Sequence, residues 1–464
     1  MRSMILRDPV HDLVRFETEE EEIVPALLDA REVQRLRRIR QLGVTNLVFP
    51  GAEHSRFTHA VGAAHVMTKL IRRLRELHEE LPFWQRLASD RARDVLAAAL
   101  LHDLGHGPYS HLFEEAIPGA PSHESWSLQI VREPTTDVHR ILVAHDGGLP
   151  ERVAALIAGE DAETPYPLPY LAHAVSGTLD VDRCDYLLRD AYMTGVRYGL
   201  FDLDWLLRSL RFGPTRDQAA PRLAIDGMKG LPALEGFVIA RRFMFEQVYL
   251  HKATRAAEAM IKAIFARAAR VLLDGTPLPA TPQAIHLAAH GHPVPLGAYL
   301  ALDDTIVGAA FAAWEGGSDE VLADLCRRLR ARRLGKTIEL FGEAALPRSI
   351  ETLLAEAREQ CAAIGLDPDA HVMVDVAEDS IALPVPPPDP LPDQPRDKIA
   401  AQWVDDPTAD RLEVILADGR ARPLGAVSSL LAQLPAAPVR RVRLVVPAEI
   451  RDVMATRVLA PRRD

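Results

Sequence analysis

"LLHDLGHGPYSH", Leu100 to His111, places three histidines and an aspartate directly behind the apolar run "DVLAAA" at 94–99. An alanine- and leucine-rich run of this kind predicts a buried helix. Burying Asp103 at the end of such a helix without a partner would cost several kcal/mol. A metal ion is an effective partner for a buried imidazole and carboxylate pair. The stretch therefore predicts a helical core built around a metal site.

The composition is that of a soluble globular protein and narrows the choice of partners. Of the 464 residues, 48% are hydrophobic and 26% are charged. The net charge of -11 argues against a generally basic nucleic-acid surface, so nucleic acid stays open as a partner but is not indicated. Local clusters such as "REVQRLRRIRQ" at 31–41 can still bind small anions, because binding depends on the local field.

Cysteine content and hydropathy indicate the compartment. The three cysteines are too few for a disulfide framework in so long a chain. The first residues, "MRSMILRDPVHD", lack the apolar stretch of a signal peptide, and no run reaches the length of a membrane span. We expect a cytoplasmic protein with no membrane partner.

Helical spacing of apolar residues dominates the first two thirds of the chain, so the predicted fold class is mainly α. Residues 382–396, "ALPVPPPDPLPDQPR", read as a proline-rich linker. Beyond them the pattern predicts strand, turn, strand, helix and strand, with a hairpin at "ADGR", and the segment that starts at "HVMVDV" can join the same sheet. The predicted units are a core at 1–270, a helical extension at 271–381, the linker, and a small C-terminal α+β domain at 397–464.

Candidate metal ligands lie in three separate stretches. They are His59 in "SRFTHAVG", the pair His102-Asp103, and one aspartate of "LDVDRCDYLLRD" at 179–190. Imidazole and carboxylate ligands suit Fe, Mn, Zn or Mg, and the lack of nearby cysteine pairs argues against a structural zinc site. The residues predict an open, catalytic site for a divalent ion whose identity stays open.

The order H…HD…D on separate helices resembles the HD-domain metal-dependent phosphohydrolases. Four stretches, "QRLRRIRQLGVTNLVFPGAEHSRFTHAVG", "LLHDLGHGPYSH", "SHESWS" and "LDVDRCDYLLRDAYMTG", resemble the deoxynucleoside triphosphate triphosphohydrolase branch of that family. The resemblance covers about residues 4–255 and implies an HD-domain helical core. It implies the metal ligands His59, His102, Asp103 and Asp182, and leaves Asp180 and Asp185 as structural groups.

The same resemblance implies roles in chemistry and phosphate binding. His123 with Glu124 is expected to transfer protons, next to His106 and Asp103, and His106 and His111 are expected to surround the α-phosphate. A structural role for His111, in a tight loop bonded to backbone carbonyls, stays open. The expected phosphate-binding cations are Arg56, Arg183 and Arg241, with Arg242 as the competing choice for the last.

Further matches to the same family imply a sugar site and a regulatory site. Gln41 and Leu42 match a pair next to the deoxyribose, where a leucine near C2′ would exclude a ribose hydroxyl. The other expected sugar contacts are Tyr186, Asp190 and Tyr249. In a predicted allosteric pocket, Asp29, Gln34 and Arg37 match guanine-recognising positions, although Arg7 replaces the family's asparagine.

These observations predict a metal-dependent enzyme that cleaves a dNTP to a deoxynucleoside and inorganic triphosphate. The family resemblance also implies a nucleotide activator and a homo-oligomer, either a tetramer or a dimer. Two other functions remain open. One is hydrolysis of another nucleotide, such as a monophosphate, a cyclic nucleotide or an alarmone. The other is a nucleotide- or nucleic-acid-binding module with little turnover.

Overall fold

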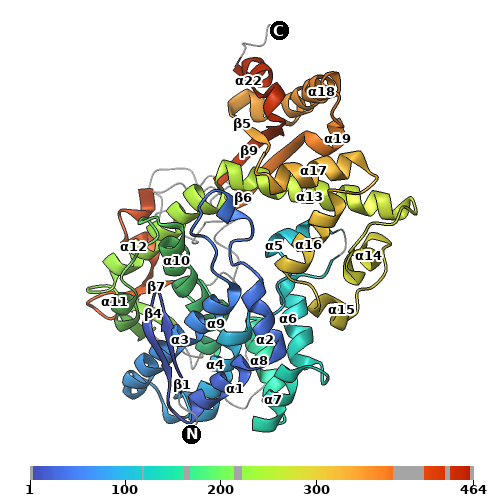
Figure 1. The fold of residues 1–464 in the computed structure, drawn as a ribbon. Coiled ribbons are helices and arrows are strands. Elements are labelled where there is room, and N and C mark those ends of the chain that lie inside the picture. Colours follow the sequence, from blue (N-terminus) through green and yellow to red (C-terminus); the bar gives the residue numbers. More distant parts are fainter. Residues whose placement is uncertain are drawn as a thin grey trace.

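Helices make up most of the chain, which confirms the mainly α fold class (Figure 1). The computed structural model describes residues 4–117, 120–160, 168–213, 222–379, 412–433 and 439–459. The N-terminal helical core contains α1 (Ile23–Leu28), α2 (Arg31–Arg35), α3 (Arg56–Glu76), α4 (Ser89–Leu101), α5 (His111–Ala116), α6 (His123–Arg132), α7 (Asp137–His145), α8 (Leu149–Ile157), α9 (Pro169–Ser176), α10 (Val181–Thr194), α11 (Leu203–Arg208) and α12 (Leu231–Met244).

Helix α3 lies at the centre of this core and packs against both α4 and α10. The approach to α10 is closest at Gly62, where a Cβ atom would meet the Asp185 carboxylate at 1.9 Å. A glycine is therefore required for the two helices to meet at this distance. Helix α4 contains the predicted apolar run and ends at Leu101, with His102 in the C-cap position. The last residues of the helix are fully buried.

Two pairs of strands accompany these helices and were not predicted from the sequence. Strands β1 (Met4–Asp8) and β2 (Asp12–Phe16) form an antiparallel hairpin. Strands β3 (Leu210–Phe212) and β4 (Leu223–Asp226) pair antiparallel after α11. The hairpin turn carries His11, whose role at the site is described below.

A second apolar cluster is centred on α13 (Lys252–Leu273), which follows a short π-helical turn at Phe245–Tyr249. Its other helices are α14 (Gln283–Ala289), α15 (Leu296–Leu300), α16 (Asp304–Trp314) and α17 (Glu320–Arg330). Two residues of this region contact the loop within "LLHDLGHGPYSH". Tyr299 donates a hydrogen bond to the Gly105 carbonyl, and Asp304 accepts one from the Tyr109 amide. The helical extension therefore supports the back of that loop.

The strands expected after residue 397 join two different sheets. Strand β7 (Glu413–Ile415) pairs parallel with β4 of the core and antiparallel with β8 (Ala421–Pro423), which confirms the hairpin at "ADGR". Strand β9 (Val439–Val446) lies between β5 (Lys336–Leu340) and β6 (Met373–Asp379). The segment that starts at "HVMVDV" thus joins the sheet of β9, as predicted, whereas β7 and β8 do not.

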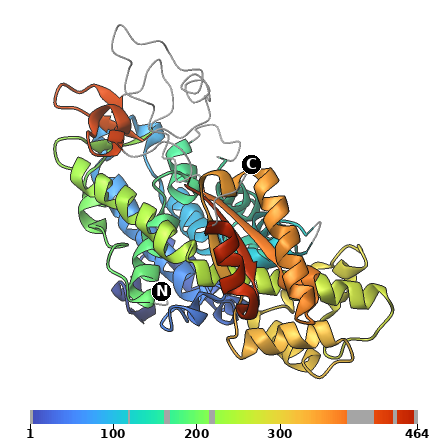
Figure 2. The same ribbon diagram turned by 90° about the horizontal axis from the view of Figure 1, so that it is seen from above.

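Figure 2 shows these two parts of the C-terminal segment at separate places, with 412–433 beside the core and α22 (Arg451–Leu459) beside α18 (Pro347–Ala363). Two short helices, α19 (Pro368–His371) and α21 (Leu424–Val427), complete the α-helices of the described residues. The predicted linker at 382–396 lies outside the described residues. The domain boundaries remain predictions.

Within the described ranges, no helix combines the length and the apolar character that crossing a membrane requires.

Candidate metal centre and catalytic site

Four side chains converge next to the end of α4. His59 lies in α3, His102 and Asp103 directly follow α4, and Asp182 lies in α10. Asp182 Oδ1 lies 3.0 Å from His59 Nε2 and 3.4 Å from His102 Nε2, and the two Nε2 atoms are 3.4 Å apart. Asp103 lies beside them, with its carboxylate oxygens 3.5 Å from His102 Nε2 and 3.7 Å from His59 Nε2. The structure thus brings together all four of the residues that the resemblance implied as ligands.

The geometry of this cluster fits a divalent ion. Bonds of about 2.1 Å to imidazole nitrogen and carboxylate oxygen give ligand-to-ligand distances of about 3.0 Å in octahedral and 3.4 Å in tetrahedral coordination. The observed separations of 3.0 to 3.7 Å lie in or near that range. His59, His102 and Asp103 form one of the groups of the described chain that could hold a metal ion.

Hydrogen bonds behind the cluster fix the orientation of both imidazoles. His59 Nδ1 lies 2.8 Å from Asp185 Oδ2, and His102 Nδ1 lies 2.9 Å from the Ala99 carbonyl. Each Nδ1 therefore carries a proton, which leaves Nε2 as the ring nitrogen that faces the centre and could bind a metal ion.

Asp185 is itself held by three polar contacts, which sequence reasoning did not identify. His11 Nε2 lies 2.7 Å from Asp185 Oδ1, and the Arg189 guanidinium donates to both Asp185 oxygens. Burial raises the pKa of Asp185, but Arg189 and the hydrogen bonds from the two histidines outweigh it, so the net pKa lies well below its usual range. A lone histidine in the segment "DPVHD" gives no pattern that could have placed His11 here.

Asp180 and Asp182 have different environments although they are neighbours. Asp180 caps α10 by accepting a hydrogen bond of 2.7 Å from the Arg183 amide, and burial raises its pKa to about 7. Asp182 points to the imidazoles instead, and their hydrogen bonds lower its pKa despite burial. The arrangement favours Asp182 over Asp180 and Asp185 as the third-helix ligand.

A second cluster of titratable groups lies next to the first. His106, His111, Glu114 and His123 place their potential ligand atoms within 4.8 Å of one another. The rings of His106 and His123 stack with centroids 3.8 Å apart, and His106 Nε2 lies 3.2 Å from Asp103 Oδ1. Burial and the charge of Arg56 lower the pKa of His106 well below its usual value, so this ring is neutral near pH 7. His106 connects the two clusters.

Glu114 is the acidic member of this cluster and was missed from the sequence. Its Oε1 lies 2.9 Å from His123 Nδ1, whereas the predicted partner, Glu124, lies 3.3 Å from His123 Nε2 and is 60% exposed. Burial raises the pKa of Glu114, but the hydrogen bond and charge of His123 lower it by more, so its pKa lies below the usual value. The signal that could have found it is its position three residues after His111, on one face of a short helix.

His111 lies in the same cluster with 63% of its side chain exposed. Its ring packs edge-on against both His106 and His123, at 4.7 and 4.8 Å between centroids. No hydrogen bond from the His111 ring to a backbone carbonyl occurs among the described residues, in contrast to the structural alternative.

The three predicted phosphate-binding arginines reach the site with different partners. Arg56 pairs with Asp103 and donates from Nε to Ser110 Oγ at 3.0 Å. Arg183 pairs with Asp180 and donates to the Gly177 carbonyl.

Arg241 and Arg242 differ in how far they are engaged. Arg242 Nε lies 2.9 Å from Glu246, one turn along the helix. Arg241 has no hydrogen-bond partner at its buried Nε among the described residues, and its guanidinium lies 5.7 Å from the Phe245 ring. Burial and Asp182 raise the pKa of Tyr186, and the charge of Arg241 opposes that rise.

Three of the predicted sugar contacts, Tyr186, Asp190 and Tyr249, form a group beside the metal cluster. The Tyr186 ring lies 6.4 Å from that of His59 and 6.3 Å from that of Tyr249. Tyr249 donates a hydrogen bond of 2.7 Å to Asp190 Oδ2. Gln41 is buried, with no partner at its Oε1 among the described residues, and Leu42 is partly buried.

The predicted allosteric residues lie on α1, α2 and the turn that follows. Gln34 donates to the Leu28 carbonyl at 2.6 Å, and Arg37 Nε donates to Gln34 Oε1 at 2.8 Å. Arg37 also lies over the Phe57 ring, at 3.5 Å. Asp29 and Arg37 are both exposed, and Arg7 pairs with Asp12 on the neighbouring hairpin.

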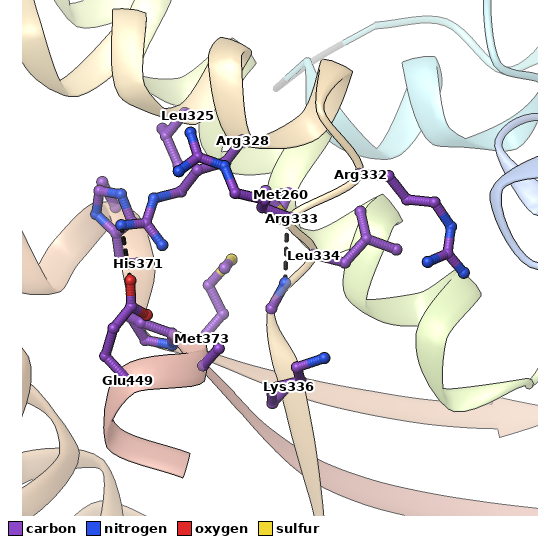
Figure 3. Close-up of a pocket in the computed structure, with 14 residues that line it drawn as sticks. Met260, Leu325, Arg328, Arg332, Arg333, Leu334, Lys336, His371, Met373 and Glu449 are labelled. Carbon is purple, nitrogen blue, oxygen red and sulfur yellow. Dashed lines mark hydrogen bonds and ion pairs between the residues drawn. The ribbon is translucent and has the colours of Figure 1, made fainter.

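A pocket of about 290 Å³ lies away from both clusters, between α17, β5, α19 and the turn before α22 (Figure 3). Arg328 is paired there with Asp324 and Glu449, and His371 also contacts Asp324. The other basic residues that line it are Arg332, Arg333 and Lys336. The lining as a whole favours an anion.

Comparison with known proteins places the chain in a family. The HD-domain family model matches residues 56–188, which include the four residues of the first cluster. The uncharacterized protein YwfO of Bacillus subtilis is 36% identical over 81% of this chain and 80% of its own length. The deoxynucleoside triphosphate triphosphohydrolase SAMHD1 of Danio rerio is 31% identical over 57% of this chain, which spans 45% of that relative.

A solved phosphohydrolase of Bacteroides thetaiotaomicron superposes with a TM-score of 0.74 and 27% identity, over 96% of this chain and all of the other. HD domains bind divalent metal ions, and the His and Asp cluster is consistent with such a cofactor. The family match over the helices that hold this cluster, and the identity to YwfO along four fifths of both chains, show that the chain belongs to the HD-domain family of phosphohydrolases.

Proposed function

We propose that this chain hydrolyses deoxynucleoside triphosphates to a deoxynucleoside and inorganic triphosphate. The observation that carries the proposal is the position of His106, 3.2 Å from Asp103 and stacked at 3.8 Å on His123. This position sets a proton-transfer cluster directly against the proposed metal ligands. The likeness to SAMHD1 proteins supports the dNTP substrate.

The reaction adds water to the α-phosphorus and breaks its bond to the 5′-oxygen. A divalent ion held by His59, His102, Asp103 and Asp182 would lower the pKa of a bound water and offset phosphate charge. The oxygen of the water goes to phosphorus, and a proton must reach the 5′-oxygen of the leaving deoxynucleoside.

The second cluster is the proposed source of that proton. An imidazole can donate a proton near neutral pH, and a carboxylate on its other nitrogen favours the charged form and fixes the ring. Glu114 has this relation to His123. We therefore assign to Glu114 the partner role that the sequence suggested for Glu124.

Arginines and the tyrosine pair would hold the two ends of the substrate. The triphosphate carries roughly four negative charges, which Arg56, Arg183 and Arg241 would offset. Gln41, Leu42, Tyr186, Asp190 and Tyr249 would form the deoxyribose site.

Regulation by nucleotide is the second part of the proposal. Asp29 and Arg37 present an exposed acceptor and an exposed guanidinium, with Gln34 hydrogen-bonded to Arg37, and this acceptor and donor suit the edge of a guanine. The pocket with Arg332, Arg333 and Lys336 offers further cations for a polyphosphate. We propose a homo-oligomer, a tetramer or a dimer, that a nucleotide activates.

The deciding experiment incubates metal-reconstituted protein with each dNTP, alone and in pairs, and separates the products by chromatography. We expect triphosphate and deoxynucleoside in equal amounts, with greater turnover in some pairs. Release of orthophosphate or pyrophosphate would instead favour a phosphohydrolase of another nucleotide. Nucleotide binding in a filter assay without turnover in any pair would favour a binding module.

A further inference from the structure

His54 is a buried histidine just before α3, and none of the roles assigned above uses its side chain. Its backbone lies in a short ladder with the segment that carries Gln41. The Gln41 amide donates to the His54 carbonyl at 3.0 Å, and the Arg56 amide donates to the Ile39 carbonyl at 2.9 Å. The backbone around His54 therefore fixes the segment of Gln41 next to that of Arg56.

The His54 side chain reaches a different part of the site. Its Nε2 lies 2.7 Å from Asp190 Oδ1, and both side chains are about 2% exposed. An ionised carboxylate only accepts hydrogen bonds, so His54 Nε2 is the donor. Within the described residues, this is the only hydrogen bond of the ring, because Nδ1 has no partner there.

Asp190 is thus held from both sides. His54 donates to Oδ1 and Tyr249 donates to Oδ2, each at 2.7 Å. The two oxygens of a carboxylate offer about four acceptor positions. The two donors leave about two acceptor positions for a ligand hydroxyl to use, and they keep the carboxylate from rotating.

We propose that His54 is a positioning residue for recognition of the sugar 3′-hydroxyl, which it serves by holding the Asp190 carboxylate in place. This inference rests on the proposed function, because it takes Asp190 as part of the deoxyribose site. The backbone link to Gln41 does not depend on the side chain. Substitution of His54 therefore changes the Asp190 side of the site alone.

The test compares binding of two probes that differ only at the 3′ position. They are the α,β-imido analogues of a 2′-deoxynucleoside triphosphate and of the matching 2′,3′-dideoxynucleoside triphosphate, measured by calorimetry. We expect His54→Phe to weaken binding of the deoxy probe about tenfold, as expected for one hydrogen bond to a charged group, and to leave the dideoxy probe unchanged. A structural role alone would weaken both probes equally.

Two further variants separate the hydrogen bond from the packing of the ring. His54→Gln can place its amide nitrogen near the Nε2 position, whereas the shorter His54→Asn cannot. We expect His54→Gln to restore preference for the deoxy probe and His54→Asn to fail. His139→Phe, in α7, is the control and should bind both probes as the wild type does, and all variants should retain their metal.

Several results would overturn the inference. They are equal weakening of both probes, no change in any His54 variant, or a wild-type chain that does not distinguish the probes. The proposed function fails in another way, by absence of triphosphate release from the wild type. If the wild type prefers the deoxy probe through His54 but releases no triphosphate, the inference about the sugar site stands and the proposed reaction is wrong.

Discussion

Glu114 Oε1 lies 2.9 Å from His123 Nδ1, while the exposed Glu124 lies 3.3 Å from Nε2 of the same ring. The two carboxylates therefore lie on opposite sides of the His123 imidazole, and each is a candidate for its partner in proton transfer. Glu114 is 17% exposed and Glu124 is 60% exposed, so the interaction with Glu114 is less screened by water. This asymmetry makes the proton-transfer assignment testable with a matched pair of variants.

Glu114→Gln is expected to lower kcat by about 100-fold, the lower end of the contribution of a general acid or base. The amide no longer stabilises the protonated ring of His123, but the hydrogen bond can persist and preserve the fold. Glu124→Gln is the matched control and should keep most of its turnover. Steady-state kinetics on both variants, with metal content measured by elemental analysis, checks the prediction. The assignment is reversed if Glu124→Gln is the more damaging change.

Asp182 and Asp185 are expected to respond differently to substitution. Asp182→Ala removes a group 3.0 Å from His59 Nε2 and should abolish both bound metal and turnover. Asp185→Asn changes a group that contacts the other ring nitrogen of His59 and not the metal site itself, and should weaken metal affinity about 10- to 100-fold. Metal retention against a competing chelator distinguishes the two. Full metal content in the Asp182 variant would show that the ligand set is wrong.

Arg241→Ala is expected to raise KM about 10- to 100-fold, the usual effect of losing a hydrogen bond between a guanidinium and a phosphate. The buried Nε atom of Arg241 has no partner within the described residues, and a phosphate oxygen would supply the acceptor that this guanidinium lacks. Arg242→Ala, its neighbour, loses mainly the pair with Glu246 and should keep its KM. Initial rates over a range of dNTP concentrations make the comparison. Equal rises in KM would remove the distinction between these residues.

The helices and the metal cluster could be predicted from local sequence for a physical reason. Apolar spacing specifies a helix and its buried face, and a polar residue at the end of a buried run needs a partner. His59, His102 and Asp182 lie at or near helix ends in that pattern. The family resemblance then supplied the order in which those helices meet.

The parts that could not be predicted depend on contacts between distant segments. Strand β7 pairs in parallel with β4, and nothing in the pattern of either short strand specifies that partner. His11 and His54 are single histidines in loops, and each acquires its role only when α10 packs against its loop. Glu114 becomes a partner of His123 because α5 and α6 fold against each other across a loop.

His65 is expected to make stability depend on pH in the acidic range. Burial, then the charges of His11, Lys69 and Arg72, lower its pKa from 6.5 to about 4. Between these values the unfolded chain binds a proton that the folded chain does not. Stability therefore falls as the pH falls from about 6.5 to about 4, and is unaffected by this group above that window.

His65→Phe removes the titrating group and keeps an aromatic ring near His11, whose own ring lies 5.1 Å away. We expect the variant to lose about 1–2 kcal/mol less than the wild type between pH 7 and pH 4.5, after allowance for partial solvent screening. Urea unfolding at a series of pH values measures this difference, and His65→Gln, which also cannot titrate, should behave in the same way. Parallel pH curves for the wild type and both variants would contradict the prediction, because every other titrating group is common to the three chains.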